Sequence, residues 1–504
     1  MKLTRKKATV LNIIFSAAYQ VITMLFGFIL PNLLLNNYGA ELHGYTSTVG
    51  NVMSYIAIIN AGLAPAAVEA LYKPLAEKDT NRINEILNAI NRFYVKSGVL
   101  YTVAVVISSV VLPFIVKEQI PGYAAVSLML VIGATNTLDC FIYSKYRVLF
   151  QADQRLFDVY LIDAIAYLAR IAVQVALIIT GADIVIVMGI PALMVMARTL
   201  GLSVVSKRIY PYLSSQVKPD NSSLHKRWNA MAHQLAGLIV YNTDVTLLTL
   251  FGNLVQVSIY SVYSLVFNNI YNMLTNIFST GTLASFGQLL NEDRRERLIE
   301  AFNIYEYGYY AVVSFVYSVT ASLILPFVSV YTKKYQDVGY VDYRLALLFM
   351  IIGIANNMRV PSGTMINAAG HFKETQWRAV LEATINLTVS LVLIKPFGMY
   401  GILFGTICSF AYRTTDIIYY SHRYVLKISC KQTILRIVRT IISILISIAL
   451  YRVIFGVYIM NSWIQWVLYA VGASIISILI VGALNYILEP TMFKSCLNSF
   501  VKKK

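Results

Sequence analysis

The sequence predicts an all-α integral membrane protein with about 14 transmembrane helices, arranged as two parallel six-helix lobes plus two extra C-terminal helices. Three observations support this fold class. Of the 504 residues, 58% are hydrophobic and only 13% are charged, whereas soluble domains average about 25% charged residues. Apolar stretches of roughly 20 residues, the length that crosses a bilayer, recur from one end of the chain to the other. The Lys and Arg residues fall mostly into alternate gaps between these stretches.

Fourteen apolar stretches are expected to span the membrane. They lie, in chain order, near 9–35, 44–72, 93–116, 122–149, 158–180, 183–206, 229–252, 255–289, 302–330, 341–369, 377–394, 398–422, 434–456 and 462–488. The eighth and the tenth are long enough to tilt or to protrude from the bilayer.

The distribution of positive charge predicts the topology. Basic residues precede the first span, and the gaps on that side of the membrane hold most of the 41 Lys and Arg residues. The opposite gaps hold only Lys117, Lys333, Lys334, Arg344, Lys395 and Arg452. Because basic loops stay in the cytoplasm, we expect a multi-pass membrane protein with both termini cytoplasmic. Topology and contact with anionic membrane lipids explain the net charge of +17, and no nucleic-acid partner is expected.

Two parts of the chain read alike at a separation of about 215 residues. Arg82 after the second span corresponds to Arg297 after the eighth, and Asp163 in the fifth corresponds to Glu382 in the eleventh. One repeat covers six spans, an even number that restores the orientation of the chain, so the halves are predicted to be parallel repeats. The predicted division is an N-terminal lobe at 1–206, a cytoplasmic linker at 207–228, a C-terminal lobe at 229–424, and two additional spans with a basic tail at 425–504.

Polar residues recur at helical spacing inside several spans, where contact with lipid is unfavourable. Together these stripes favour a hydrated substrate cavity, and hydrogen bonds between helices are the alternative explanation. The candidate cavity residues without charge are Gln20, Asn268, Asn272, Asn276 and Asn356.

Arginines within spans are the strongest sign of an anionic substrate. Arg170 and Arg359 lie near the middle of their spans, where a charge costs at least about 2.5 kcal/mol by insertion scales. Guanidinium groups bind phosphate in a bidentate way, so both are candidate diphosphate ligands, with ion pairing across helices as the alternative. Asp163 precedes Arg170 by seven residues on the same helical face and is a candidate partner for it. Arg413 has Asp416 at i+3, which predicts a structural ion pair.

Three further polar residues are candidates for cation coupling. Asp244, Glu382 and Asn386 offer the carboxylate and amide oxygens that bind a hard cation, and a protonatable acid suits proton coupling equally well. Helix capping by these acids, or pairing of Glu382 with Arg359, is the alternative. The histidines have no metal-ligand spacing, so no metal site is expected beyond a sodium site, and no cofactor beyond Na⁺ or H⁺.

Two runs near the N-terminus carry a family resemblance. The first span opens with KATVLNIIFSAAYQVITMLFGFILPNLLLNNYG, and the second span contains YTSTVGNVMSYIAIINAGLAPAAVEAL. With these runs the chain resembles polysaccharide-export flippases of the multidrug/oligosaccharidyl-lipid/polysaccharide superfamily. The resemblance implies a carrier and not an enzyme, located in the bacterial cytoplasmic membrane. Such a carrier moves undecaprenyl-diphosphate-linked oligosaccharides from the cytoplasmic to the outer leaflet by alternating access. The implied partners are this lipid-linked substrate and the polymerase and glycosyltransferases of the same polysaccharide pathway.

Other functions stay open at this point. Flippases for the lipid-linked peptidoglycan precursor are similar and also have fourteen spans, although their cavities carry more arginine than this sequence suggests. Cation-coupled multidrug exporters of the superfamily usually have twelve spans. A membrane polysaccharide polymerase needs a substantial outer loop, and the outer gaps here are short. The chain has no Walker A motif, which argues against ATP as its energy source.

Overall fold

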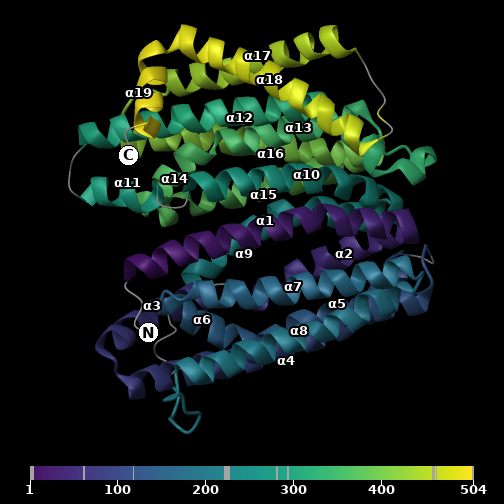
Figure 1. Cartoon of the computed structure of the whole chain (residues 1–504), viewed down its shortest axis with the longest axis vertical. Helices are drawn as coiled ribbons and strands as arrows, with labels where there is room; N and C mark the ends of the chain where they lie inside the picture. Colours follow the sequence, from purple (N-terminus) through teal and green to yellow (C-terminus); the bar gives the residue numbers. More distant parts are fainter. Residues whose placement is uncertain are drawn as a thin grey trace. The chain divides into compact units, whose positions relative to one another are not determined.

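The computed structural model describes residues 5–60, 63–116, 119–220, 227–279, 282–291, 295–456, 460 and 462–501. Helices make up nearly all of these residues, and this described part of the chain contains no strand. The chain divides into two compact units, Met1–Ser258 and Ile259–Lys504. The first runs from purple to teal in Figure 1 and the second from teal through green to yellow.

Each unit contains both long and short helices. The first unit contains α1 (Arg5–Tyr38), α2 (Ala40–Ile56), α3 (Leu63–Glu77), α4 (Thr80–Val116), α5 (Gly122–Leu138), α6 (Ser144–Ala152), α7 (Leu156–Ile179), α8 (Ile184–Ile209), α9 (Arg227–Phe251) and the first residues of α10 (Leu254–Ser279). The second unit contains the rest of α10, then α11 (Thr282–Asn291), α12 (Arg295–Tyr331), α13 (Tyr343–Met358), α14 (Val360–Ala368), α15 (Phe372–Phe397), α16 (Met399–Tyr420), α17 (Lys431–Phe455), α18 (Trp463–Leu488) and α19 (Pro490–Val501).

The predicted spans correspond to these helices. Each of the fourteen matches one helix or two consecutive helices. Ten helical stretches among the described residues are long and apolar enough to cross a membrane. The remaining four predicted spans, which are α2 with α3, α9, α10 with α11, and α16, are helical but shorter or more polar. The predicted fold class is confirmed, and the chain is a multi-pass membrane protein.

Two spans are interrupted at a charged residue. The fourth passes from α5 through a π-helical turn, Asp139–Tyr143, into α6. The tenth is interrupted at Arg359, between α13 and α14, where Pro361 follows within the first turn of α14. Proline lacks an N–H group and clashes with the preceding turn, so a continuous helix is disfavoured there. Such interruptions free backbone groups and are frequent at functional sites.

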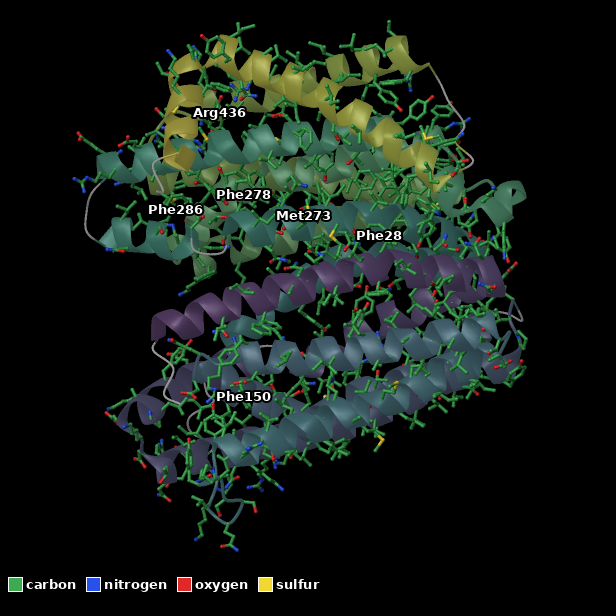
Figure 2. All side chains as sticks on the ribbon, viewed as in Figure 1. Phe28, Phe150, Met273, Phe278, Phe286 and Arg436 are labelled. Carbon is green, nitrogen blue, oxygen red and sulfur yellow. The ribbon has the colours of Figure 1, made fainter. Side chains whose placement is uncertain are left out.

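The first half of the predicted linker is fastened to α4. The Asn84 side-chain amide donates to the carbonyl of Tyr212 (3.0 Å), and that of Asn88 donates to the carbonyl of Val217 (2.9 Å). Arg82 forms an ion pair with Asp220 (2.7 Å). Hydrogen bonds to Glu85 and then to Asp220 raise the pKa of the Arg82 guanidinium. This part of the linker is therefore held against the first unit, whose core nearby includes the fully buried Phe150 labelled in Figure 2.

Helix α12 is the centre of the second unit. Helices α13, α17 and α18 all pack against it. Its aromatic residues continue this packing on another side, where Phe278 meets Tyr309 and Phe286 meets Tyr305 with ring centroids 5.1 and 5.5 Å apart. Both phenylalanines are labelled in Figure 2. The two extra C-terminal spans therefore belong to the same compact unit as the helices of the second repeat.

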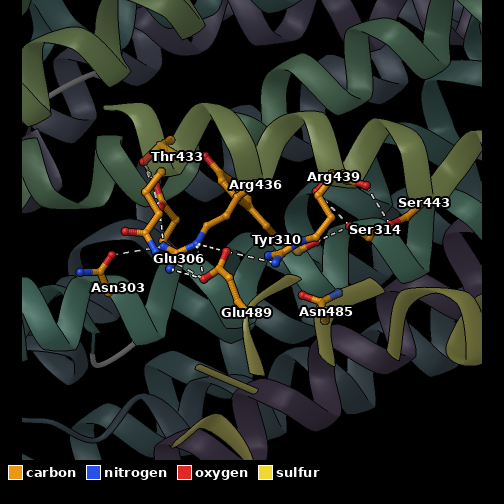
Figure 3. Close-up of polar contacts among 12 residues, drawn as sticks. Asn303, Glu306, Tyr310, Ser314, Thr433, Arg436, Arg439, Ser443, Asn485 and Glu489 are labelled. Atoms are coloured by element: carbon orange, nitrogen blue, oxygen red, sulfur yellow. Dashed lines mark hydrogen bonds and ion pairs between the residues drawn. The ribbon is translucent and has the colours of Figure 1, made fainter. Parts of the chain in front are cut away.

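A buried ion cluster fixes these extra helices (Figure 3). Arg436 of α17 lies 2.8 Å from the Glu306 carboxylate of α12 and 2.9 Å from Glu489, which follows α18. Arg439 lies 3.0 Å from Glu489, and the Thr433 hydroxyl donates to Glu306. Burial opposes ionisation of Glu489, but the hydrogen bond and charge of Arg436 outweigh it and hold the pKa of that carboxyl below its usual value. Two arginines and two glutamates thus neutralise each other at the end of the extra helices.

The compact units differ from the predicted lobes at one helix. Helix α9, the seventh span, packs on α2 and α3 in the first unit, although the repeat places it at the start of the C-terminal lobe. The lobe boundaries at 206 and 229 stay a prediction.

Replacing Gly405 tests the packing between α15 and α16. A Cβ atom at Gly405 would lie 2.8 Å from the backbone nitrogen of Ser390 and 3.0 Å from the carbonyl oxygen of Asn386, and neither backbone atom can move alone. Overpacking typically costs about 1–3 kcal/mol. Gly405→Ala should lower the thermal unfolding temperature of the detergent-purified protein by several degrees. Gly50→Ala is the control, because a Cβ there meets no atom within 4 Å. Equal unfolding temperatures for the two variants would contradict the packing.

Replacing Glu306 tests the ion cluster. Glu306→Ala removes one of the two carboxylates that neutralise the fully buried Arg436. Breaking a buried pair from one side destabilises by about 3–5 kcal/mol, so unfolding should occur at a clearly lower temperature. Glu296→Ala, an exposed acid in the first turn of the same helix, should have no effect. If Glu306→Ala and Glu296→Ala unfold at the same temperature, the cluster does not hold α17 in place.

Candidate functional site

The second unit carries a network of five charged residues around the interruption of the tenth span. Arg359 donates to Glu382 of α15 (2.6 Å) and to the Asn356 side chain (2.6 Å). The other oxygen of Glu382 lies 3.3 Å from Arg413 of α16, and Arg413 pairs with Asp416 at 3.0 Å. Asp416 also pairs with Arg378 of α15. The structure contains the predicted Arg413–Asp416 pair and, for Arg359 and Glu382, the ion pairing that the sequence left open as an alternative.

This network bears on whether Arg359 binds an anionic substrate or has a structural role. Its guanidinium is buried, lies over the ring of Phe410 at 4.5 Å, and faces a carboxylate. An arginine so neutralised binds an anion only if the ion pair opens. A diphosphate role for Arg359 stays a prediction, and the geometry favours a structural role.

The three candidate cation ligands lie on two helices, one in each unit. Asp244 is buried on α9 in the first unit, while Glu382 and Asn386 are buried on α15 in the second unit. The Asn386 amide donates to the Thr406 hydroxyl (3.0 Å), and its buried side-chain oxygen has no hydrogen-bond partner within the described residues. Both oxygens of Glu382 already face arginine, which makes it a poor ligand for a second cation. That these residues form one cation site stays a prediction.

The first unit carries a corresponding network. Asp163 of α7 accepts a hydrogen bond from Tyr143 (2.7 Å), and Arg198 of α8 lies 3.9 Å from it. Arg198 also pairs with Asp139 at the start of the π-helical turn and lies over the Tyr143 ring at 4.2 Å. In both units an acid of the fifth helix of the repeat thus approaches an arginine of the sixth, next to the interrupted fourth. The charged residue at the interruption is the acid Asp139 in the first unit and the base Arg359 in the second.

Sequence reasoning missed part of this arrangement. It gave no role to Asp139, and it considered Asp163 as a partner of Arg170. A signal for the true partner exists, because Arg198 and Arg413 are separated by the same distance of about 215 residues as the repeat. The ion cluster around Arg436 was also missed, since its residues come from helices far apart in the sequence.

Arg170 differs from the other arginines of the spans. Its side chain is partly buried in α7 and lies over the ring of Tyr167 at 5.1 Å. Its Nε atom is buried and lacks a hydrogen-bond partner, and no carboxylate of the described residues forms an ion pair with it. Tyr167 forms a side-chain hydrogen bond with Arg170, so the guanidinium has a polar neighbour but no counter-charge among the described residues.

Three asparagines of α10 lie outside the core of the protein. Asn268, Asn272 and Asn276 recur every four residues, and all three are exposed. Gln20 of α1 is half-buried. Exposed amides on a helix of membrane-spanning length are costly in contact with lipid, so this face of α10 is suited to water or to a polar ligand.

A polar seam joins α2 to α9 and to the start of α10. The His43 ring contacts the Ser258 hydroxyl (2.7 Å), Thr48 contacts Thr249 (3.0 Å), and the Asn51 amide donates to Thr246 (2.9 Å). The helices approach closely because residue 44 is glycine: a Cβ there would lie 1.9 Å from the carbonyl oxygen of Leu254. The seam consists of reversible hydrogen bonds and contains no ion pair among these residues, so it is suited to opening and closing.

Comparison with known proteins identifies the fold. No protein-family model and no curated protein matches the sequence. The lipid II flippase MurJ, in an inward closed conformation, superposes with a TM-score of 0.68 at 12% identity, over 95% of this chain and 98% of that one. An inward-facing multidrug resistance MATE family transporter of the MOP superfamily gives 0.63 at 12% identity, over 81% and 95%.

A MOP superfamily transporter from Pyrococcus furiosus, whose structure is described as showing reverse polarity of the binding pocket, gives a TM-score of 0.55 at 13% identity, over 85% of this chain and 100% of that one. At identities this low the likeness shows the fold. The resemblance seen in the sequence is thereby confirmed at the level of architecture: the chain has the fold of the MOP-superfamily transporters and flippases.

Proposed function

We propose that this protein flips undecaprenyl-diphosphate-linked oligosaccharides across the bacterial cytoplasmic membrane by alternating access. The observation that carries the proposal is Arg170, a guanidinium within a membrane span that has no carboxylate partner in the described residues. An unpaired arginine there costs at least about 2.5 kcal/mol, which an anionic ligand offsets. Guanidinium groups and phosphates form short, bidentate, charge-assisted hydrogen bonds.

The exposed amides support a glycan as the second part of the substrate. Asn268, Asn272 and Asn276 present donors and acceptors along about two turns of α10. Sugar hydroxyls need such mixed partners, whereas organic cations, the usual cargo of drug exporters, need carboxylates or aromatic rings. A polyprenyl chain stays in the lipid throughout.

Alternating access requires contacts that form in one state only. The seam of His43, Thr48 and Asn51 with α9 and α10 is such a contact. By the predicted topology it lies in the outer half of the membrane, so its opening exposes the substrate site outward. Membrane potential or a cation gradient resets the carrier. Because both oxygens of Glu382 face arginine, Asp244 remains the candidate coupling residue. Both termini lie in the cytoplasm, beside the glycosyltransferases that supply the substrate.

A second candidate is flipping of the lipid-linked peptidoglycan precursor. The specific observation in its favour is the superposition on the lipid II flippase MurJ over nearly the whole length of both chains. The two candidates share the lipid diphosphate and differ in the glycan, so one vesicle assay with both substrates separates them.

Arg170→Ala should reduce flipping of a fluorescent undecaprenyl-diphosphate oligosaccharide in reconstituted vesicles by about 10- to 100-fold, because one or two charge-assisted hydrogen bonds are lost. Arg170→Lys should retain part of the activity, since it keeps the charge without the bidentate geometry. Arg208→Ala, at an exposed position of α8, is the matched control and should flip normally. Wild-type flipping by Arg170→Ala would show that the diphosphate is bound elsewhere.

Joining Thr48 to Thr249 should arrest the carrier. The two hydroxyls are 3.0 Å apart, so cysteines at these positions are expected to form a disulfide on oxidation. Oxidised Thr48→Cys/Thr249→Cys protein should lose flipping, and reduction should restore it. Each single-cysteine variant, treated in the same way, controls for the four native cysteines. A fully cross-linked protein that still flips its substrate would mean that the seam stays closed throughout transport.

A further inference from the structure

His422 lies where the second repeat meets the extra helices. It belongs to the π-helical turn Ser421–Leu426, which follows α16 and leads towards α17. Its side chain is buried, and its ring packs edge-on against the ring of Phe302 in α12, with centroids 5.7 Å apart. A buried histidine that contacts several helices can make their packing depend on pH.

A series of short contacts connects this ring to the ion cluster. The Nδ1 atom of His422 lies 2.8 Å from the carbonyl oxygen of Ile418, and the Nε2 atom lies 2.9 Å from the Thr433 hydroxyl of α17. The same hydroxyl lies 2.8 and 3.0 Å from the two carboxylate oxygens of Glu306 in α12 (Figure 3). All of these distances are those of hydrogen bonds.

The three contacts of this series need three protons. A carbonyl oxygen only accepts, so Nδ1 of His422 must carry a proton. The Thr433 hydroxyl has one proton, which it donates either to Nε2 or to Glu306. A neutral histidine and an ionised glutamate therefore satisfy two contacts, and in the third they place two acceptors against each other. The arrangement is complete only when it binds one more proton.

The ring of His422 is the better place for this proton. Glu306 also pairs with Arg436 at 2.8 Å, and a neighbouring arginine favours the ionised carboxylate. With both ring nitrogens protonated, His422 donates to Ile418 and to Thr433, and Thr433 donates to Glu306. The ring also lies at the C-terminal end of α16, where the helix dipole favours a cation.

The other charged groups near the turn are paired or exposed. The two arginines of the ion cluster are paired with its glutamates, and Asp416 of α16 is paired with arginines. Arg295 of α12 donates to carbonyls at the end of the turn, and Arg423 and Lys427 are exposed. Helices α11 and α14, which pack near the turn, contain no titratable residue. Glu306 is therefore the carboxylate that compensates a proton on His422.

We infer that His422, Thr433 and Glu306 form a proton-dependent latch that fastens the extra helices. With the proton bound, the latch joins the end of α16 to α17 and to α12. Without it, the Thr433 hydroxyl can donate to only one of its two neighbours, and one connection opens. By the predicted topology the latch lies at the cytoplasmic end of the spans, so it responds to cytoplasmic pH. The inference goes beyond the proposed function and does not depend on the substrate.

The pH dependence of unfolding tests the latch. The thermal unfolding temperature of the detergent-purified protein is measured from about pH 6 to about pH 8.5, a range that begins where a free histidine titrates. The folded latch binds a proton at a pH where the unfolded chain has released it, so its stabilisation is present at low pH and is lost as the pH rises. The wild type should therefore lose several degrees more over this range than His422→Asn, which keeps a donor for Ile418 and cannot be protonated.

A second variant and a control complete the test. Thr433→Val removes the hydroxyl between the ring and the carboxylate at nearly constant volume, and should reduce the pH dependence as His422→Asn does. His371→Asn is the matched control, because His371 contacts Tyr420 and not the latch, and should keep the pH dependence of the wild type.

The protonation state is read directly by ¹⁵N NMR of protein with ring-labelled histidine. At about pH 7, above the range in which a free histidine is protonated, the signal that disappears in His422→Asn should show two protonated nitrogens in the wild type. The same ring should show one in Thr433→Val. If His422→Asn does not fold, Thr433→Val serves for both the comparison and the assignment.

Two results would overturn the inference. If the wild type and the latch variants lose stability equally as the pH rises, no proton links these helices. If the His422 ring of the wild type carries a single proton at about pH 7, the count of protons in the latch is wrong. Either result leaves the proposed function standing, because flipping is measured separately.

Discussion

The structure depends on one constraint: a guanidinium within a bilayer needs a counter-charge. Arg198, Arg359 and Arg413 satisfy it with carboxylates from neighbouring helices of their own unit. At the start of α17, Arg436 satisfies it twice, and so fastens the extra helices to the second unit. Arg170 alone among the four arginines predicted within spans lacks such a partner in the described residues. The first three hold helices together, and the exception marks where an anion is expected.

The charged networks also explain which helices of each unit are held together most firmly. In each, ion pairs join the fifth and sixth helices of the repeat beside the interrupted fourth, so the interruption lies next to a cross-link between helices. The seam between α2 and α9 has a different character, with neutral hydrogen bonds and a glycine contact. Neutral hydrogen bonds exchange with water at little net free energy, whereas buried ion pairs do not. Movement is therefore expected along the seam and not within the networks.

Much of the fold was accessible from the sequence, because span length and positive charge act locally along the chain. The Arg413–Asp416 pair was predictable for the same reason, since its residues are one helical turn apart. The partner of Arg359 was not, because Glu382 lies on another helix and the choice between it and a substrate depends on packing. The lack of a carboxylate partner at Arg170 within the described residues is equally invisible in sequence: Asp163 has the right spacing but binds Tyr143 instead.

The most direct measurement is the salt dependence of undecaprenyl diphosphate binding to Arg170→Gln and Arg198→Gln proteins, compared with the wild type in the same detergent. Arg170→Gln removes the unpaired guanidinium and Arg198→Gln removes a paired one on the neighbouring helix. The account predicts that Arg170→Gln weakens binding at least about 10-fold and flattens its salt dependence, while Arg198→Gln lowers stability and leaves the affinity of the folded protein nearly unchanged. Equal affinities for Arg170→Gln and the wild type would contradict the claim that the unpaired arginine binds the substrate.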